Sequence, residues 1–422
     1  MTFQSPRGTT DILPQDQQFW ALIRTATQKI AERFGYSRIE TPIFEDTGLF
    51  NRGVGQSTDI IEKETYTFID RGGDSLTLRP EGTAPICRSY VEHGMHNLPQ
   101  PIRLFYLIQN FRYERPQAGR FRQHNQFGIE VFGEPDAYID AEVIEVAWRF
   151  LEELNLNNIS LSINSIGDAL CRPNYVTNLK EYYSDLRNTL CEDCDRRLDT
   201  NPLRLLDCKV EGCQPIVANA PKSEDHLCRE CEEHWNELQT HLSNIKIPFF
   251  IDHRLVRGLD YYSRTVFEIS PPVDGRTNVI AGGGRYDGLI EQIGGPNTPG
   301  IGFGMGLERV IDNLKRENIA PPQINSTLIL IAHMGTPAKT EAIKLASQIR
   351  STGCRTVIGP SRGLKSQLRY ANSIKASHCI ISGEDELKDG TYTVRNLNDS
   401  DQNRLSPKAI IEKFSKSAYP AE

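Results

Sequence analysis

Four arginines lie close together in one short polar segment of this chain. The segment is Phe111–Arg122, and its arginines are Arg112, Arg115, Arg120 and Arg122. Apolar runs at 102–108 and 127–132 lie on either side, which is typical of two paired strands joined by a hairpin loop. Guanidinium groups are planar, permanently charged forks that match phosphate oxygens. The segment therefore favours a polyphosphate site, and a solvated basic hairpin is the simpler alternative.

Glycine alternates with apolar residues from Gly300 to Gly306. Successive side chains of a strand point to opposite faces, so all four glycines would leave one face without side chains. A flat ligand can lie against such bare backbone. Arg309 would follow on the first turn of the next helix, beside the bare face. The spacing departs from the dinucleotide-binding fingerprint, and a glycine-rich turn is the alternative.

Three further segments carry polar groups in suggestive places. Residues 281–288 indicate a second bare strand, which ends in Arg, Tyr and Asp. Arg257 stands alone in the apolar stretch 255–262 and needs an anionic partner, either Asp260 or a bound phosphate. Within 79–83, a glutamate and a threonine would either hold a ligand amine or cap the next helix. Three separated arginines, bare strands and the lack of a Walker lysine together favour a bent nucleoside triphosphate on an open antiparallel sheet.

The elements that must position these groups follow from hydrophobic periodicity. A helix is predicted over 14–34, and strand-like runs recur through the first 321 residues, which indicates an antiparallel sheet with flanking helices, an α+β core. This core is expected in two parts, 1–170 and 249–321, separated by a Cys-rich helical insertion over 171–248. Pro321-Pro322 marks a linker. Strands alternating with helices over 326–422 predict a small α/β domain.

Length, composition and charge narrow the class of protein. A chain of 422 residues suggests two or three domains. With 38% hydrophobic residues, no run as long as a membrane span and no secretory h-region, the chain is expected in the cytoplasm, with no membrane partner. Residues 326–422 hold 14 basic and 9 acidic residues, whereas the remainder holds 34 and 46. This basic end is a mild pointer to a polyanionic partner, and ordinary surface variation explains it equally well.

The cysteines suggest a metal site. In a cytoplasmic chain the ten cysteines are expected as thiols or metal ligands rather than disulfides. Two CxxC pairs bracket a loop that contains Cys208 and Cys213. Their spacing predicts a structural zinc site, and a set of reduced, partly buried thiols is the alternative. The predicted ligands are Cys191, Cys194, Cys228 and Cys231.

Taken together, these motifs resemble those of bacterial histidyl-tRNA synthetases over essentially the whole chain. The stretch 7–14 looks like that family's N-terminal signature, and 36–45, 111–132 and 300–309 resemble class II motifs 1, 2 and 3. Two stretches, 255–262 and 281–286, are similar to histidine-specific motifs, which are far more specific than the class II motifs. The resemblance implies a class II adenylating core, a homodimer formed partly through motif 1, and a C-terminal anticodon-binding domain.

The same resemblance implies roles for individual residues. The substrates would be ATP with Mg²⁺, L-histidine and tRNA(His). Arg112 would hold the α-phosphate and Arg309 the γ-phosphate, while Arg257 would place a fixed cation on the α-phosphate and also meet the bound histidine. The remaining predicted contacts are Gly302 and Gly304 for ATP; Glu81, Gly82, Thr83 and Gln126 for the histidine amino group; Glu130 and Tyr262 for the imidazole; Tyr261 and Tyr286 as walls; and Arg115, Gln117 and Arg120 for the tRNA acceptor end.

One departure and two rival functions accompany the resemblance. The family commonly has Phe-His before the glutamine at 126, whereas this chain has His124-Asn125. A catalytically inactive regulatory paralogue of ATP phosphoribosyltransferase would share the core but lack the C-terminal domain. A zinc-dependent RNA-binding module without chemistry would explain the cysteines and the basic end, but not the alternating glycines.

Overall fold

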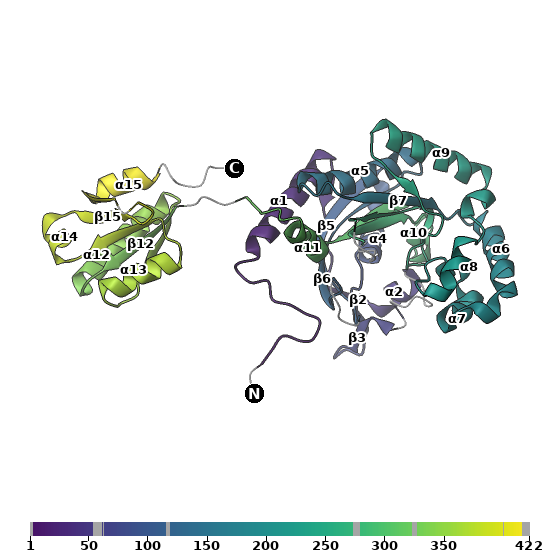
Figure 1. Ribbon diagram of the computed structural model, residues 1–422, viewed down its shortest axis with the longest axis horizontal. Helices are drawn as coiled ribbons and strands as arrows, with labels where there is room; N and C mark the ends of the chain where they lie inside the picture. Colours follow the sequence, from purple (N-terminus) through teal and green to yellow (C-terminus); the bar gives the residue numbers. More distant parts are fainter. Residues whose placement is uncertain are drawn as a thin grey trace. The chain divides into compact units, whose positions relative to one another are not determined.

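The chain forms two compact units in the computed structural model, Met1–Pro321 and Pro322–Glu422 (Figure 1). The structure describes residues 3–53, 61, 63–114, 119–272, 279–322, 327–399 and 401–415. In these ranges, no helix is long and apolar enough to cross a lipid bilayer.

An eight-stranded sheet is the centre of the first unit. Its order is β1-β5-β6-β11-β10-β9-β7-β8. The strands are β1 (Ser37–Arg38), β5 (Ile102–Phe111), β6 (Gln123–Phe132), β7 (Ser160–Ser165), β8 (Phe250–Ile251), β9 (Ser263–Ser270), β10 (Ala281–Arg285) and β11 (Gly300–Gly306). The interior pairings are all antiparallel, and only the edge strands β1 and β8 pair in parallel. The predicted antiparallel sheet, and the pairing of the runs around the arginine segment, are confirmed.

Four helices cover one face of this sheet and complete the largest hydrophobic core (Figure 1). They are α1 (Gln17–Arg33), α5 (Ala137–Glu153), α9 (Arg229–Asn244) and α11 (Leu307–Arg316). The helix predicted from residue 14 begins at Gln17, because residues 14–16 form a turn instead. Helix α5 was not predicted. Its sequence does carry a helical period, because the less buried residues Tyr138, Glu142, Glu145, Arg149 and Glu152 recur at helical spacing and buried, mostly apolar residues fill the rest.

A fully buried ion pair joins the sheet to these helices. Arg285 at the end of β10 bonds to the carboxylate of Asp140 on α5, and neither side chain has any exposed surface. The guanidinium also donates to the carbonyl oxygens of Glu134, at 3.0 Å, and Asp136, at 3.2 Å. Arg285 thus ends β10 with its hydrogen bonds made to Asp140, Asp287 and two backbone carbonyl oxygens, and it serves the core rather than a ligand.

The opposite face of the sheet carries smaller helices and a second, smaller sheet. Helix α4 (Thr83–Glu92) and helix α10 (Leu289–Gln292) pack together there. A separate three-stranded sheet has the order β2-β4-β3, with β2 (Phe44–Asp46), β3 (Tyr66–Ile69) and β4 (Ser75–Leu78). Helix α2 (Thr47–Gly53) follows β2.

Helices of different lengths fill residues 171–248, the stretch expected to be a helical insertion. They are α6 (Arg172–Asp185), α7 (Glu192–Thr200), α8 (Gln214–Ala218) and the long α9. The two CxxC pairs lie in different clusters. Cys191 and Cys194 group with Cys208 and Cys213, whereas Cys228 and Cys231 group with Asp168 and Cys171. The predicted site of Cys191, Cys194, Cys228 and Cys231 is therefore wrong. Cys228 and Cys231 lie at the start of α9, where they group with Asp168 and Cys171 instead of with the first CxxC pair.

The second unit is an α/β domain, as predicted. Its sheet has the order β13-β12-β14-β15-β16. The strands are β12 (Leu328–His333), β13 (Arg355–Ile358), β14 (His378–Ser382), β15 (Tyr392–Asn396) and β16 (Gln402–Leu405), and the helices are α12 (Thr336–Ser351), α13 (Leu364–Ser373), α14 (Glu384–Asp389) and α15 (Pro407–Ser415). Helix α14 and the exposed edge strand β16 were not predicted, because both are too polar to show an apolar period.

We expect Asp140→Ala to destabilise the first unit strongly. It would remove the fully buried partner of Arg285 and leave only the partly exposed Asp287 carboxylate. Breaking a buried ion pair typically costs about 3–5 kcal/mol. Urea unfolding followed by circular dichroism measures the change. Asp193→Ala is the control, because its partner Arg196 is 58% exposed and such pairs contribute about 0–1 kcal/mol. Equal, small losses in both variants would contradict this prediction.

Candidate functional site

Three glycines lie side by side across the middle of the large sheet. Gly304 on β11 is paired with Gly128 on β6 and with Gly282 on β10. Tyr106 on β5 and Glu268 on β9 continue the same row at its two ends. Paired residues of neighbouring strands point to the same face, so the row forms a floor of bare backbone between two larger side chains.

Polar side chains of the protein itself occupy much of the space over this floor. A Cβ atom on Gly304 would collide with the Gln126 amide, and one on Gly282 would collide with the Arg257 guanidinium. A Cβ on Gly302 would collide with the carboxylate of Glu130. The predicted bare face of β11 is present, and glycine there makes room for polar side chains. Gly304 also lines the adjoining cavity, whereas Gly302 lies against Glu130 and does not line it.

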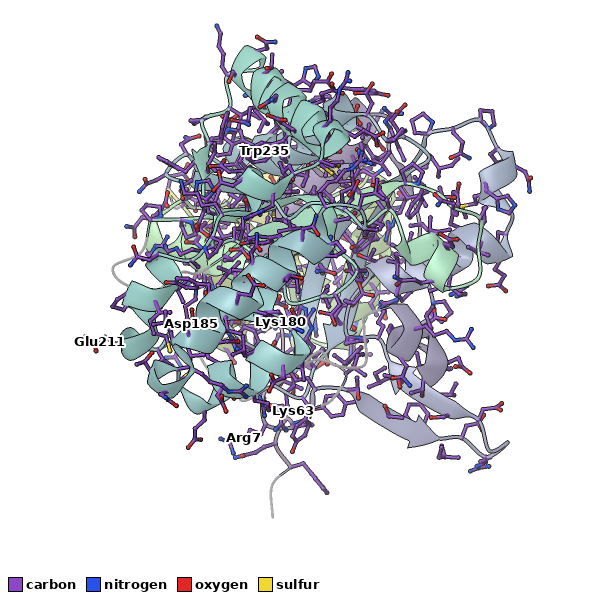
Figure 2. All side chains as sticks on the ribbon, turned by 90° about the vertical axis from the view of Figure 1, so that its right-hand side faces the viewer. Arg7, Lys63, Lys180, Asp185, Glu211 and Trp235 are labelled. Carbon is purple, nitrogen blue, oxygen red and sulfur yellow. The ribbon has the colours of Figure 1, made fainter. Side chains whose placement is uncertain are left out.

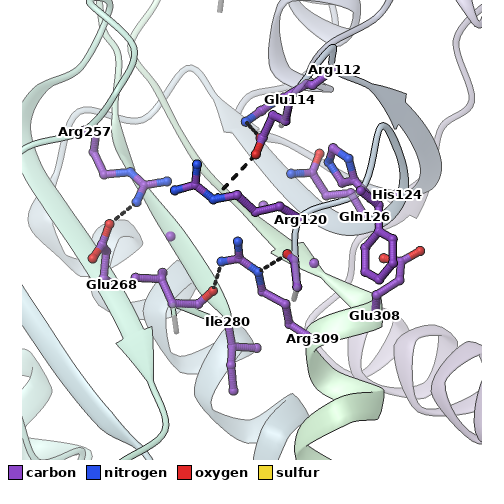
Figure 3. A pocket seen from close by; sticks show the side chains of 16 residues that line it. Arg112, Glu114, Arg120, His124, Gln126, Arg257, Glu268, Ile280, Glu308 and Arg309 are labelled. Atoms are coloured by element: carbon purple, nitrogen blue, oxygen red, sulfur yellow. Dashed lines mark hydrogen bonds and ion pairs between the residues drawn. The ribbon is translucent and has the colours of Figure 1, made fainter. Parts of the chain in front are cut away.

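A cavity of about 290 Å³ opens over the glycine floor (Figure 3). Four guanidinium groups point into it, from Arg112, Arg120, Arg257 and Arg309. The structure thus brings together the three arginines singled out from widely separated parts of the sequence. The other lining residues are Glu114, Gly119, Phe121, His124, Gln126, Glu268, Val279, Ile280, Gly282, Gly304, Gly306 and Glu308.

Backbone carbonyl groups hold two of these arginines. The Nε of Arg112 donates to the carbonyl oxygen of Pro80 at 2.7 Å. The Nε of Arg309 donates to that of Gly119 at 2.9 Å, and its Nη1 donates to that of Val279 at 2.5 Å. Within the described ranges, no carboxylate lies within ion-pair distance of Arg309. Burial, and then the positive charge of Arg120, lower the pKa of Arg309.

Arg257 is positioned by a carboxylate from the sheet. Its Nη1 bonds to Glu268 on β9, and Asp260, one of the two partners considered, instead accepts from the Nδ2 of Asn201 at 2.8 Å. The Arg257 guanidinium lies over Gly282, and both residues line the cavity. Its Nε is buried and has no hydrogen-bond partner among the residues that the structure describes. The Arg257 guanidinium therefore keeps one buried donor that is unmatched among the described residues.

His124 and Asn125, the two residues that depart from the family's usual pattern, have different contacts. His124 lines the cavity, and burial, together with the charges of Arg112 and Arg309, lowers its pKa to about 3. Its imidazole is therefore neutral near pH 7 and adds no further positive charge. The backbone N–H and the side-chain Nδ2 of Asn125 each donate to Glu308 at 2.8 Å, which joins β6 to the start of α11. Asn125 thus has a structural contact at the edge of the cavity.

A buried carboxylate with three hydroxyl donors lies next to the cavity. Glu130 is fully buried, four residues from Gln126 on β6, and so points to the same face. It accepts from Thr83 Oγ1 at 2.8 Å, from the Tyr106 hydroxyl at 3.0 Å and from the Tyr286 hydroxyl. Burial raises its pKa to about 8, although the hydroxyl donors lower it. We call Glu130, Thr83, Tyr106 and Tyr286 the Glu130 nest.

Aromatic rings surround this nest. The ring centroids of Tyr261 and Tyr262 lie 4.7 Å apart, and those of Tyr261 and Tyr286 lie 5.6 Å apart. All three rings are buried, and burial raises the pKa of each hydroxyl. The sequence analysis placed these tyrosines at one pocket but missed Tyr106, which lies within an apolar run and gave no separate signal.

The residues predicted to surround the histidine amino group already make contacts within the protein. Both oxygens of Glu81 accept backbone N–H groups at the start of α4, from Thr83 at 2.7 Å and Ala84 at 2.8 Å, so the helix-capping alternative is observed. Gly82 is the N-cap residue, and a Cβ there would collide with the Tyr106 ring. Gln126 accepts from the Nδ2 of Asn110 at 2.7 Å.

The arginine segment itself is only partly described. Arg115 and Gln117 lie outside the described residues. Arg120 is 53% exposed and lies 3.5 Å from Glu114. Arg122 stacks over the ring of Tyr113 at 3.9 Å and contributes to the hairpin rather than to the cavity.

Sequence reasoning missed four polar residues of the cavity, namely Glu114, Glu268, Glu308 and the lining role of His124. Glu268 offered a signal, since it is the one acidic residue in the predicted strand 266–269. Its proximity to Arg257 follows only from strand register. The arrangement as a whole suits a polyanion in the cavity and a ligand with N–H groups at the Glu130 nest.

Comparison with known proteins gives a consistent result. Residues 8–310 match the family model described as histidyl-tRNA synthetase, and residues 326–417 match that of an anticodon binding domain. A histidine–tRNA ligase of Dehalococcoides mccartyi is 55% identical over 95% of this chain and 96% of its own length. One from Caldicellulosiruptor bescii is 45% identical over 98% of both chains. The solved structure of apo S. aureus histidyl-tRNA synthetase superposes with a TM-score of 0.83, at 35% identity, covering 98% of this chain and all of that one.

We expect Glu130→Gln to change how stability depends on pH. The folded-state pKa of about 8 lies above the ordinary value of 4.5. Between these two pH values the folded chain holds a proton that the unfolded chain has lost, so stability falls as pH rises. The decrease is up to about 1.4 kcal/mol per pH unit. The amide cannot titrate, so the variant should lose this decrease in urea unfolding between pH 5.5 and 7.5.

The control for this measurement is Glu92→Gln on α4, whose side chain is 57% exposed. It should keep the wild-type dependence on pH. An unchanged slope in Glu130→Gln would show that Glu130 is already ionised in the folded chain, contrary to the prediction.

Proposed function

The chain belongs to the histidyl-tRNA synthetase family, and we propose that it is a histidine–tRNA ligase that joins L-histidine to tRNA(His) through a histidyl-adenylate. The observation that carries this proposal is the convergence of Arg112, Arg257 and Arg309 on one cavity beside the Glu130 nest. The cavity would take the phosphates of ATP, which arrives as its Mg²⁺ complex. The nest would take the side chain of histidine.

The first reaction needs alignment and charge neutralisation more than proton transfer. The carboxylate of histidine attacks the α-phosphorus of ATP, a new P–O bond forms, and the bond to pyrophosphate breaks. The attacking oxygen is already an anion, so no general base is required. Negative charge grows on the phosphate oxygens, and preset cations stabilise it without reorganising. In the second reaction, a hydroxyl at the tRNA acceptor end takes the histidyl group and AMP leaves.

The arginines have contacts that fit these tasks. Arg257 and Arg112 would neutralise the α-phosphate, and Arg309 would hold the γ-phosphate. Carbonyl groups orient Arg309 without cancelling its charge. Arg112 is held by a carbonyl group and lies 4.0 Å from a carboxylate oxygen of Glu114. The buried Nε of Arg257 has no partner among the described residues. A phosphate would supply the anionic partner that such buried cations require.

Histidine recognition is assigned to the Glu130 nest and its aromatic walls. Glu130 and Tyr262 would bond to the imidazole nitrogens, with Tyr261 and Tyr286 enclosing the ring. Glu81, Gly82, Thr83 and Gln126 would surround the α-amino group. A pocket that hydrogen-bonds both ring nitrogens would leave buried polar groups unpaired with any analogue that lacks them, which gives discrimination of several orders of magnitude.

Contacts with tRNA are assigned to both units. Arg115, Gln117 and Arg120 would meet the acceptor end, largely through phosphates and unpaired bases, so binding should weaken as salt rises. The basic second unit would bind the anticodon. The compartment that goes with these substrates is the cytoplasm.

A homodimer is part of the proposal, and a surface near the site supports it. Four apolar residues of β2, β3 and the residue before β2 are between 43% and 66% exposed, namely Ile43, Phe44, Phe68 and Ile69. We call them the apolar edge. The rings of Phe44 and Phe68 lie 6.3 Å apart, so these two exposed side chains are neighbours across the small sheet. Exposed apolar patches are typical of protein interfaces, and part of the apolar edge belongs to the stretch that resembles motif 1.

The two rival functions are less favoured. An inactive regulatory paralogue would lack the second unit and would not need the arginine cavity. An RNA-binding module without chemistry leaves both the glycine floor and the buried carboxylate unexplained.

We expect purified protein to catalyse ATP–pyrophosphate exchange with histidine and with no other amino acid. Arg257→Ala should reduce the exchange rate by about 10²–10³-fold, because one preset charge is removed from the transition state. Arg33→Ala, whose side chain is 56% exposed on α1, is the matched control and should keep wild-type exchange. Histidine binding without any exchange, from folded wild-type protein, would instead favour the regulatory paralogue.

We expect Phe68→Asp to convert a dimer into a monomer. The introduced charge would be buried without a partner in the apolar interface. Size-exclusion chromatography with light scattering gives the molar mass, and circular dichroism verifies the fold. Ile343→Asp serves as the control, since this residue is 49% exposed in the second unit. A dimer that persists in Phe68→Asp would exclude the apolar edge as the interface.

A further inference from the structure

Four cysteines of the helical insertion converge on one point, although they come from two separate segments. Cys191 and Cys194 flank the start of α7, and Cys208 and Cys213 lie in the loop before α8. Their Sγ atoms all lie within 4.8 Å of one another. Figure 2 faces this region, with Lys180 and Asp185 on α6, Glu211 between the two loop cysteines in sequence, and Trp235 on α9.

The spacing of the sulfurs fits a tetrahedral ion. Zinc binds thiolates at about 2.3 Å, so the four ligand sulfurs of a tetrahedron lie about 3.8 Å apart. The Sγ atoms of Cys191 and Cys208 are 3.9 Å apart. That separation is far longer than the bond of a disulfide, about 2.05 Å.

Backbone amides are already directed at the sulfurs. The N–H of Cys191 donates to the Sγ of Cys213, and the N–H of Val210 donates to the Sγ of Cys208, both at 3.4 Å. Cys191 is the N-cap of the nine-residue helix α7, and Cys194 lies in its first turn. Amide donors and the positive end of a helix both stabilise negative sulfur, so the loop is preformed for thiolates.

The cluster is closed, as a structural site should be. Cys194, Cys208 and Cys213 are buried, and only Cys191 is partly exposed. With four protein ligands, no position remains for a water or a substrate.

The surrounding segment also needs a cross-link. Helices α7 and α8 have nine and five residues, too short to be stable alone in water. Between them lies Asn201, whose Nδ2 donates to Asp260 at 2.8 Å, three residues after Arg257. An ion at the cluster would therefore brace the loop that contacts the Arg257 segment.

The second cluster is a poorer cation site. It consists of Asp168, Cys171, Cys228 and Cys231. The Asp168 carboxylate is already used, because it accepts from Arg264 at 3.3 Å and from the backbone N–H of Leu170 at 2.9 Å. The guanidinium of Arg264 would also repel a divalent ion at that position.

We propose that Cys191, Cys194, Cys208 and Cys213 bind one structural zinc ion as a tetrathiolate. Each thiol releases its proton to solvent as its sulfur–zinc bond forms. This site differs from the ligand set expected from the CxxC spacing, and it does not depend on the proposed ligase activity.

The test measures metal content in the full-length chain. Wild type, Cys208→Ser and Cys228→Ser are purified under reducing conditions without chelator, incubated with zinc, desalted and analysed by mass spectrometry of the metal. The two variants are matched, since each removes one thiol from one cluster. Cys208→Ser should contain one zinc per chain less than wild type, while Cys228→Ser should keep the ion at the proposed cluster.

Two results would overturn the proposal. One is zinc content in Cys208→Ser equal to that of wild type, and the other is wild-type protein that takes up no zinc. A loss in Cys228→Ser alone would assign the ion to the second cluster instead.

Cobalt substitution covers the case in which Cys208→Ser fails to fold. Wild type and Cys228→Ser, titrated with Co²⁺, should both show the visible bands of tetrahedral cobalt with intense thiolate charge transfer, saturating at one equivalent for the proposed cluster. Added zinc should abolish the bands. No tetrahedral thiolate spectrum in Cys228→Ser would contradict the assignment.

Discussion

The lack of side chains on three paired glycines is the constraint on which the site depends, because it makes room for polar side chains and for the adjoining cavity. Gly128, Gly304 and Gly282 lie in register on three adjacent strands, and any Cβ there would collide with a functional side chain or with backbone. Removing side chains from the centre of a sheet weakens the strands. The compensation is the dense core on the opposite face, where four helices pack against the same strands. One face therefore stabilises the sheet while the other stays open.

Positive charge is concentrated over this floor by arginines whose side chains are held by neighbouring protein groups. Neutral carbonyl oxygens orient Arg309, so its geometry is fixed while its charge remains effective. Arg112 donates to a carbonyl oxygen in the same way and has Glu114 at 4.0 Å. Where a carboxylate is used, as in Arg257 with Glu268, a buried donor is still left over. By contrast, Arg285 is paired with two carboxylates, the buried Asp140 and the partly exposed Asp287. The same residue type thus serves binding or stability according to whether its charge is already matched.

Two chemically different regions meet along strand β6. Gln126 borders the cationic cavity, and Glu130, four residues away on the same face, is the centre of the buried nest. A single strand therefore connects the proposed phosphate and histidine regions and fixes the distance between them. Asn125 secures this strand to α11 through Glu308, so that the start of α11, with Arg309, follows the same register.

The sequence by itself determined the two-unit organisation, the antiparallel core, the three arginines and the family, because hydrophobic period, alternating glycines and local motifs are properties of neighbouring residues. It could not determine which distant groups meet. Arg257 pairs with Glu268 rather than Asp260, and the first CxxC joins Cys208 and Cys213 rather than the second CxxC. Strand register and helix packing decide such contacts, and both are set by the whole core rather than by any local stretch of chain.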